Sequence, residues 1–328
     1  MRTIPVNKSE TQPGPVNSPV NGAVTTPIKL VEASLTYQEP LICAVYGGPG
    51  SGKSRLAGTA PGDIGCIPME HKSRMSITRA AAQFGRKVIL PDIDLVRSAR
   101  GQLIETMPSQ CITPEMIKRE VRAAMKDEDA EKTAERQMEK KTDAIPLDGK
   151  QPACCQRCYY RWFANRTKSV AYRMAEMDSI KTIVIDPFGQ FVDDMLFANY
   201  GRNEKIMPLD RKSFNREVID FLNSICHKHV ILTHHSDQVW KDNKPTTKTK
   251  PRNSFSKLGH FLSVVIELVR DDDADASRGE STFQMLVKDC QPNVALIDHR
   301  TPLLVDGDIT FQQLAVAVYP DADPEGWE

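Results

Sequence analysis

The sequence has no long apolar run, no excess of charge of either sign and few aromatic residues. No stretch approaches the roughly 18 consecutive apolar residues of a membrane-spanning helix, so we expect no membrane partner. Lysine plus arginine number 43, as do aspartate plus glutamate, which argues against a generally basic nucleic-acid coat and leaves local patches open. The first residues lack the apolar core of a secretory signal. We therefore expect a reducing cytoplasm, in which the 8 cysteines are thiols or metal ligands rather than disulfides.

The chain of 328 residues divides by composition into a tail, a core with an insertion, and a short acidic end. Residues 1–36 are rich in Pro, Asn, Ser and Thr and show no hydrophobic period, so they are predicted to be a disordered tail. Residues 37–320 are predicted to form one α/β domain. Within it, a charged stretch without strands, at about 105–177, is predicted to be a helical, cysteine-containing insertion. Residues 321–328 are predicted to be an acidic tail.

Short apolar runs alternate with helical patterns through the core. Seven of them are predicted to be strands: Leu41–Tyr46, Ile64–Met69, Lys87–Leu90, Thr182–Ile185, His229–Thr233, Val264–Val269 and Phe283–Val287. The alternation of strands and helices indicates an α/β fold with a mainly parallel central sheet.

The strongest motif is a complete Walker A pattern, G-x-x-x-x-G-K-[ST], at Gly47–Ser54, which we call the phosphate loop. Its glycines let the backbone curl so that successive N–H groups converge on phosphates at the positive end of a helix. Lys53 would place its charge on the β- and γ-phosphates of ATP, and the Ser54 hydroxyl would ligate Mg²⁺. The residues predicted to bind the nucleotide are Gly47, Gly48, Pro49, Gly50, Ser51, Gly52, Lys53, Ser54 and Arg55.

Two carboxylates that follow apolar runs complete the predicted site. Asp186 comes directly after Thr182–Ile185, at the edge of a parallel sheet where ligands bind, and is predicted to hold the Mg²⁺ shell. Pro187 follows it, so the base that activates water is sought elsewhere. Glu70 directly follows the run Ile64–Met69 and is the candidate base. On position alone, an exposed loop residue is an equally good interpretation of Glu70.

These pieces, in this order, resemble the RecA-like P-loop core. They are most similar to the phage-encoded RecA-like ATPases that assist single-strand annealing and recombination. The resemblance rests on GGPGSGKS, on a strand that closes in Met69-Glu70-His71, and on TIVIDPFGQF and VILTHHSDQ. It covers about Leu41 to Val287 and leaves out the predicted insertion.

The resemblance implies roles for the residues that match it. Glu70 would polarise the attacking water beside Lys53, and Asp186 would accompany the magnesium. A polar residue after the run His229–Thr233 would sense the γ-phosphate and relay its state to a DNA-binding loop. Here that residue is His235 or His234, whereas RecA itself has Gln at this place.

The segment after the proposed sensor, Lys241–Lys257, concentrates positive charge against a single acid, Asp242. Its Pro, Thr and Asn content predicts neither a strand nor a long helix. The resemblance implies that this loop binds single-stranded DNA by neutralising phosphates, and Trp240 and Phe255 are candidates for stacking on bases. A disordered, solvated loop is the alternative interpretation. The predicted DNA-binding residues are Lys241, Lys244, Lys248, Lys250, Arg252 and Lys257.

Three cysteines, Cys154, Cys155 and Cys158, cluster in the predicted insertion. A C-x-x-C pair is half of a structural zinc site, which needs four ligands. Cys111 is the candidate fourth ligand, because the sequence has no second C-x-x-C pair. Reduced thiols packed beside aromatic residues are the other interpretation.

The sequence therefore predicts a RecA-like ATPase, stimulated by single-stranded DNA, that works in phage-type recombination, annealing or repair. The resemblance implies a homo-oligomeric ring or filament in which Lys288 serves a neighbour's γ-phosphate. Further partners would be single-strand-binding or other replication and recombination proteins, and a phage origin would place the protein in the bacterial host cytoplasm. Two alternatives stay open: a nucleotide or small-molecule kinase of P-loop type, and a KaiC-like ATP-dependent assembly or regulatory protein.

Overall fold

The computed structural model describes the core of the chain and leaves several segments aside. The described residues are 39–92, 156–200, 208–252, 255–270, 283–297, 300–303, 310–321 and 327. The predicted disordered tail, residues 1–36, lies outside them, and so does the predicted insertion up to residue 155.

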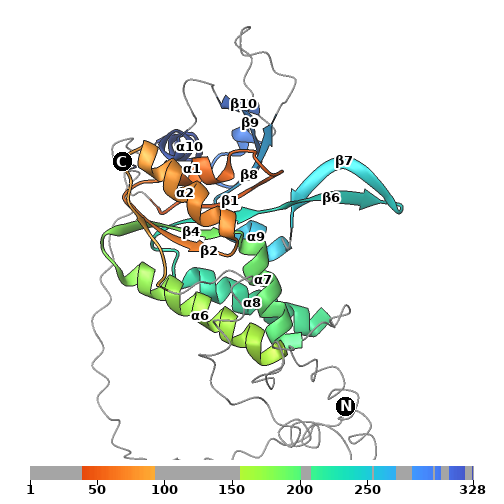
Figure 1. The fold of residues 1–328 in the computed structure, drawn as a ribbon. Helices are drawn as coiled ribbons and strands as arrows, with labels where there is room; N and C mark the ends of the chain where they lie inside the picture. Colours follow the sequence, from red (N-terminus) through yellow and green to blue (C-terminus); the bar gives the residue numbers. More distant parts are fainter. Residues whose placement is uncertain are drawn as a thin grey trace, which may run out of the picture. The chain divides into compact units, whose positions relative to one another are not determined.

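An eight-stranded sheet, in the order β10-β9-β8-β1-β5-β4-β2-β3, forms the centre of the fold (Figure 1). From β8 to β3 all neighbours are parallel, whereas β9 and β10 are added antiparallel to β8. The predicted α/β class with a mainly parallel sheet is confirmed, and each predicted run is a strand. The strands are β1 (Ile42–Gly47), β2 (Asp63–Pro68), β3 (Val88–Ile89), β4 (Ile180–Asp186), β5 (His229–His234), β8 (Val264–Arg270), β9 (Phe283–Cys290) and β10 (Arg300–Leu303).

Helices cover both faces of the sheet (Figure 1). Alternate strand residues, such as Ile183 and Ile185, belong to an apolar cluster with α6, α7 and α8, and those between them, such as Val184, pack with α1, α2 and α10. Strands buried on two faces read as continuous apolar runs, which is why the sequence revealed them. The helices are α1 (Lys53–Gly58), α2 (His71–Gln83), α6 (Gln156–Glu176), α7 (Phe188–Tyr200), α8 (Pro208–Asn223), α9 (Ser256–Phe261) and α10 (Phe311–Val318).

Helix α6 belongs to the core rather than to an insertion. Phe163, Ala171 and Met174 on this helix are buried in the same apolar cluster as β4. Residues 156–176, at the end of the insertion predicted at about 105–177, therefore pack with the core, and the earlier part of that prediction lies outside the described residues. Within the described parts of the chain, no helix is both long enough and apolar enough to cross a membrane.

The basic segment forms a β-hairpin of β6 (Ser236–Lys241) and β7 (Lys244–Pro251), so the prediction that it contains no strand is wrong. Asp242 and Asn243 make the turn, with φ of 51° and 60°. Asp and Asn tolerate this left-handed backbone, which two-residue hairpin turns require. The turn lets the Thr-rich stretch pair as a strand, and the hairpin extends away from the large sheet (Figure 1).

The end of the chain contributes a buried aromatic residue to the core. Trp327, inside the segment predicted to be an acidic tail, is 1% exposed. Its ring stacks on Tyr319, with centroids 5.8 Å apart, and lies 5.4 Å from the ring of His229. His229 in turn accepts a hydrogen bond at Nδ1 from the backbone N–H of Leu41, at 2.9 Å.

We predict that His229 makes the fold sensitive to acid. Burial lowers the pKa of His229 to about 4, whereas the unfolded chain binds this proton near pH 6.5. The free energy of unfolding should therefore fall as the pH drops from about 6.5 to about 4, by on the order of 3 kcal/mol from this group. In urea unfolding across this range, His229→Gln should flatten the fall and His260→Gln, at an exposed position, should not. Equal slopes in wild type and His229→Gln would contradict this.

Candidate nucleotide site

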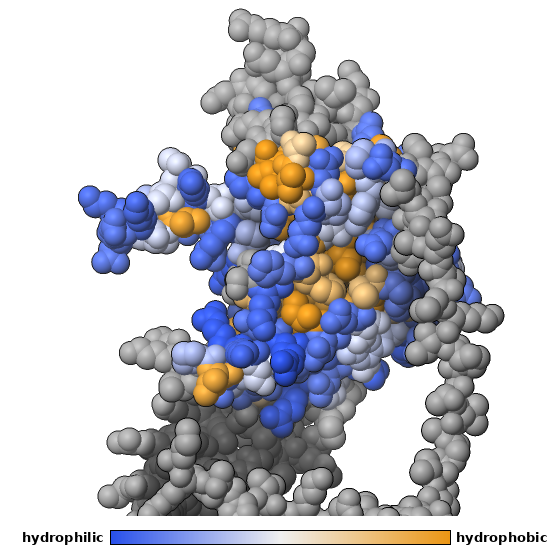
Figure 2. All heavy atoms as spheres, turned by 180° about the vertical axis from the view of Figure 1, so that it is seen from behind, coloured by the Kyte–Doolittle hydropathy of each residue, from blue (hydrophilic) through white to orange (hydrophobic). Residues whose placement is uncertain are grey.

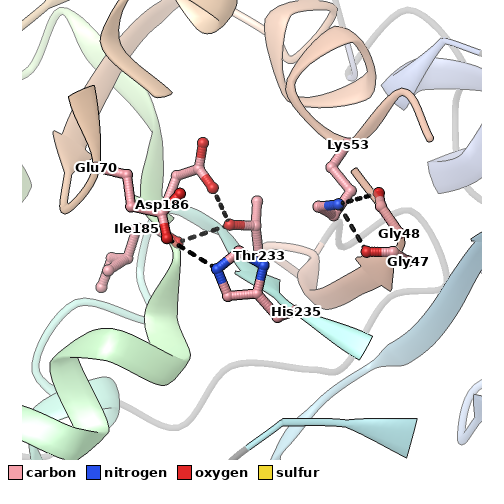
Figure 3. A network of polar contacts seen from close by, with 8 residues as sticks. All are labelled: Gly47, Gly48, Lys53, Glu70, Ile185, Asp186, Thr233 and His235. Atoms are coloured by element: carbon pink, nitrogen blue, oxygen red, sulfur yellow. Dashed lines mark hydrogen bonds and ion pairs between the residues drawn. The ribbon is translucent and has the colours of Figure 1, made fainter. Parts of the chain in front are cut away.

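The carboxyl ends of four adjacent parallel strands, β1, β5, β4 and β2, gather the predicted site residues along one edge of the sheet (Figure 3). The phosphate loop follows β1, His235 follows β5, Asp186 ends β4 and Glu70 lies just beyond β2. Strand register aligns them, since Pro68 pairs with Asp186 and the backbone N–H of Met69 donates to the Asp186 carbonyl at 2.7 Å.

The phosphate loop curls around the ammonium group of Lys53. Gly47, Gly50 and Gly52 have φ of 153°, 75° and 93°, backbone conformations that side chains disfavour. Lys53 Nζ donates to the carbonyl oxygens of Gly47 and Gly48, each at 2.8 Å (Figure 3). Burial lowers the pKa of Lys53, and the charges of Asp186 and Glu70 act to raise it. A phosphate oxygen would offer this cation a stronger, charge-assisted partner than a neutral carbonyl.

Asp186 is a buried carboxylate, 6% exposed, that faces the phosphate loop. The hydroxyl of Thr233 donates to its Oδ1, and the side chain of Ser73 also bonds to it. Burial raises the pKa of Asp186, whereas these two hydrogen bonds and the charge of Lys53 act to lower it. A buried negative charge of this kind is stabilised by a cation, which suits Mg²⁺, with Asp186 and the Ser54 hydroxyl as the residues that would hold it.

Nothing among the described residues forms a metal site made by the protein alone, since no group of three or more His, Cys, Asp or Glu is arranged to hold an ion. The zinc prediction falls outside the described residues, because Cys111, Cys154 and Cys155 are not among them and the side chain of Cys158 is not described.

Glu70 and His235 contact each other at the same edge. Glu70 is the N-cap residue of α2, but its side chain does not cap the helix. Its Oε1 instead lies 2.8 Å from Nε2 of His235 (Figure 3). The side chains are 45% and 44% exposed, so this is a solvated contact.

His234 points away from this edge, because neighbouring side chains of a strand lie on opposite faces. It is fully buried, and its Nδ1 lies 2.9 Å from the carbonyl oxygen of Arg252. Burial lowers the pKa of His234 to about 4, so the ring is neutral near pH 7. Of the two histidines that the sequence offered as the γ-phosphate sensor, His235 is the one placed at the edge with Glu70.

Thr233 and Ser73 are site residues that sequence reasoning did not assign. Thr233 lies two positions before His235, on the same side of the strand end. Thr233 contacts the carboxylate of Asp186 on the neighbouring strand β4, and His235 contacts that of Glu70 beyond β2. This period of two is the signal that would have revealed Thr233. Ser73 lies on α2 and carries no motif, so the sequence alone contained no signal for it.

At the tip of the hairpin, Lys241 and Lys244 lie on one face and Trp240 lies on the other. Residues directly opposite each other in an antiparallel pair share a face, and Lys241 pairs with Lys244 as Asp237 pairs with Lys250. Trp240 pairs with Pro245 on the other face and is 64% exposed. The surface view shows the hairpin as a mainly hydrophilic projection (Figure 2). All six predicted DNA-binding residues, Lys241, Lys244, Lys248, Lys250, Arg252 and Lys257, are exposed.

Phe255 and Lys288 are already engaged within the chain. Phe255 packs against the apolar cluster of α6, α7 and α8, which argues against the predicted stacking on bases. Lys288 Nζ lies 3.3 Å from Oε2 of Glu267. The hydroxyl of Thr249 in β7 donates to the other carboxylate oxygen of Glu267, so the hairpin is anchored on β8, beside the strand that carries the phosphate loop.

Comparisons with known proteins find no matching family model and no matching curated protein. Among solved structures, the chain is similar to one described as the crystal structure of the RadB recombinase, with 12% sequence identity and a TM-score of 0.37. The match covers 82% of this chain and 89% of that chain. The strand order and directions of the sheet define the α/β fold independently of this likeness.

We predict that the first glycine of the phosphate loop cannot be replaced. A Cβ on Gly47 would lie 2.2 Å from the Leu268 carbonyl oxygen and 2.6 Å from Ser51 Oγ. Gly47→Ala should therefore lower the free energy of unfolding by roughly 1–3 kcal/mol. Gly48→Ala is the matched control, since a Cβ there meets nothing within 4 Å, and it should change stability by less than about 0.5 kcal/mol. Equal stability of the two variants in urea unfolding would refute the steric argument.

Proposed function

We propose that this protein binds ATP with Mg²⁺ at the phosphate loop, hydrolyses it, and binds single-stranded DNA through its hairpin in phage-type recombination, annealing or repair. One observation carries the proposal. Lys53, Asp186 and Glu70 meet at one sheet edge, and the basic hairpin begins directly after His235, at that same edge. The resemblance of the motifs to RecA-like ATPases supports a homo-oligomeric ring or filament as the working form.

The side chains divide the work of hydrolysis. Lys53 leaves the loop carbonyls and pairs with the β- and γ-phosphates, while Ser54 and Asp186 would hold the Mg²⁺. The magnesium, when bound, neutralises charge that develops on the phosphate oxygens. Glu70 accepts a proton from the water that attacks the γ-phosphorus, which needs a carboxylate at the rim of the site. Its partly exposed position at the end of β2 supports that role.

The charge arrangement of the hairpin supports a polyanionic ligand. Lys241 and Lys244 lie directly opposite each other, and like charges in that position destabilise a strand pair. A phosphate backbone bound along the hairpin lysines would relieve this repulsion and release counterions. Trp240 lies on the opposite face from this pair and is 64% exposed, so we assign contacts with phosphates to the lysines and keep Trp240 as a candidate for stacking on a base.

Our first functional prediction concerns the hydrolytic residues. Lys53→Ala should abolish ATP binding, because the phosphates lose their point charge. Glu70→Gln should keep ATP binding and lower turnover by roughly a hundredfold or more, since general-base catalysis contributes about 10²–10⁴. Phosphate release is measured with Mg²⁺, with and without single-stranded DNA, and Glu176→Gln, at an exposed position on α6, is the control.

The same assay separates the alternatives. Transfer of phosphate to a small-molecule acceptor in place of water would indicate a kinase. Unaltered turnover in Glu70→Gln would remove the hydrolytic role and favour a KaiC-like assembly protein. A wild type that neither binds single-stranded DNA nor responds to it would defeat the proposed function.

Our second functional prediction concerns the lysines of the hairpin. Lys248→Gln combined with Lys250→Gln should weaken binding to a single-stranded oligonucleotide. The double variant should also make the plot of log affinity against log salt shallower by about 0.7 per lysine. Lys87→Gln combined with Lys181→Gln removes two exposed lysines near the opposite, amino-terminal edge of the sheet and should leave affinity and slope unchanged. Equal slopes for both double variants would count against the hairpin as the binding surface.

A further inference from the structure

Three consecutive side chains at the end of β5 make contacts with three different parts of the protein. Thr233 donates to the Asp186 carboxylate, His234 bonds to the carbonyl of Arg252, and His235 bonds to Glu70. Because side chains alternate, the first and third face the chemical edge while the second faces the hairpin side. This short strand end therefore touches the metal-binding carboxylate, the proposed base and the hairpin at once.

We call the pair His235 and Arg252, which flanks β6 and β7, the neck of the hairpin. The backbone groups of Arg252 hold it closed. The N–H of Arg252 donates to the His235 carbonyl at 2.8 Å, and its own carbonyl lies 2.9 Å from Nδ1 of His234. A carbonyl can only accept, so Nδ1 of His234 carries the proton. The hairpin, residues 236–251, therefore joins the core at Arg252, which bonds to both histidines. A shift of Arg252 moves His235.

The contact between His235 and Glu70 opposes the role proposed for Glu70. Nε2 of His235 occupies Oε1, one of the two carboxylate oxygens that could accept the proton of the attacking water. Because both side chains are about half exposed, solvent screens the contact, which leaves it easy to break.

We propose that His235 is a positioning residue that restrains Glu70, and that ligand binding on the hairpin releases it by shifting the neck at Arg252. This inference rests on the proposed function, in which Glu70 is the base and the hairpin binds single-stranded DNA. Stimulation of hydrolysis by DNA then comes from a freed base, not from tighter nucleotide binding. It is therefore a change in kcat at constant KM for ATP.

The test replaces His235 in two ways. His235→Ala removes the donor and should raise kcat without DNA about two- to fivefold, the small factor expected for a solvated contact, with KM unchanged. Stimulation by an oligothymidylate should shrink by the same factor. His235→Gln keeps an N–H donor near the position of Nε2 and should restore the low basal rate. His260→Ala, at an exposed position in α9, is the control and should behave as wild type.

The outcomes separate this inference from the function on which it rests. A fall in kcat for His235→Ala, with and without DNA, would mean that His235 orients Glu70 for catalysis, and would overturn the restraint. Equal DNA stimulation in wild type and His235→Ala would overturn it as well, while leaving a DNA-stimulated ATPase in place. A wild type without hydrolysis would overturn both the restraint and the proposed function. Both substitutions lie at a half-exposed side chain, so urea unfolding should show wild-type stability.

Discussion

The carboxylate of Asp186 is buried where β2, β4 and β5 meet, and the rest of the candidate site is arranged around its charge. Burial alone would favour its neutral form, so the structure surrounds it with hydroxyl donors from Thr233 and Ser73 and with the ammonium of Lys53. Lys53 is itself desolvated and depends on the nearby carboxylates. Each group thus offsets part of the cost of burying the other's charge, and in the proposed function phosphates with a divalent cation would complete the balance.

These charges lie close to one another only because the parallel strands of the sheet end at the same edge. The ladder from β1 through β5 and β4 to β2 brings residues from distant parts of the sequence to one edge, and both faces of the ladder are sealed by helices. The buried histidines follow the same logic. His229 and His234 stay neutral because burial lowers the pKa of each to about 4, so neither adds charge to the sheet near pH 7.

The end of β5 connects the chemistry to the surface. Its alternating side chains divide between the carboxylates and the neck of the hairpin, and the hairpin is fixed a second time where Thr249 meets Glu267 on β8. In the proposed function, a ligand on the hairpin would act through two attachment points, β5 and β8, both next to the strand that carries the phosphate loop. Coupling between distant sites needs a physical connection of this kind, with contacts that can change.

The sequence by itself determined the local features: the phosphate loop, the buried strands and the carboxylates that end them. Each of these features follows from a short sequence pattern, either of glycines or of apolar residues that are buried on both faces of the sheet. The tertiary structure decided which side chains meet. Glu70 and His235 are 165 positions apart, and Thr233 and Asp186 are 47 apart, so their contacts depend on strand order and register. The hairpin was not predicted because the composition of the segment disfavours a strand, and pairing depends on the turn at Asp242 and Asn243. Helix was predicted in the region of α6, but its place in the core depends on the sheet against which it packs.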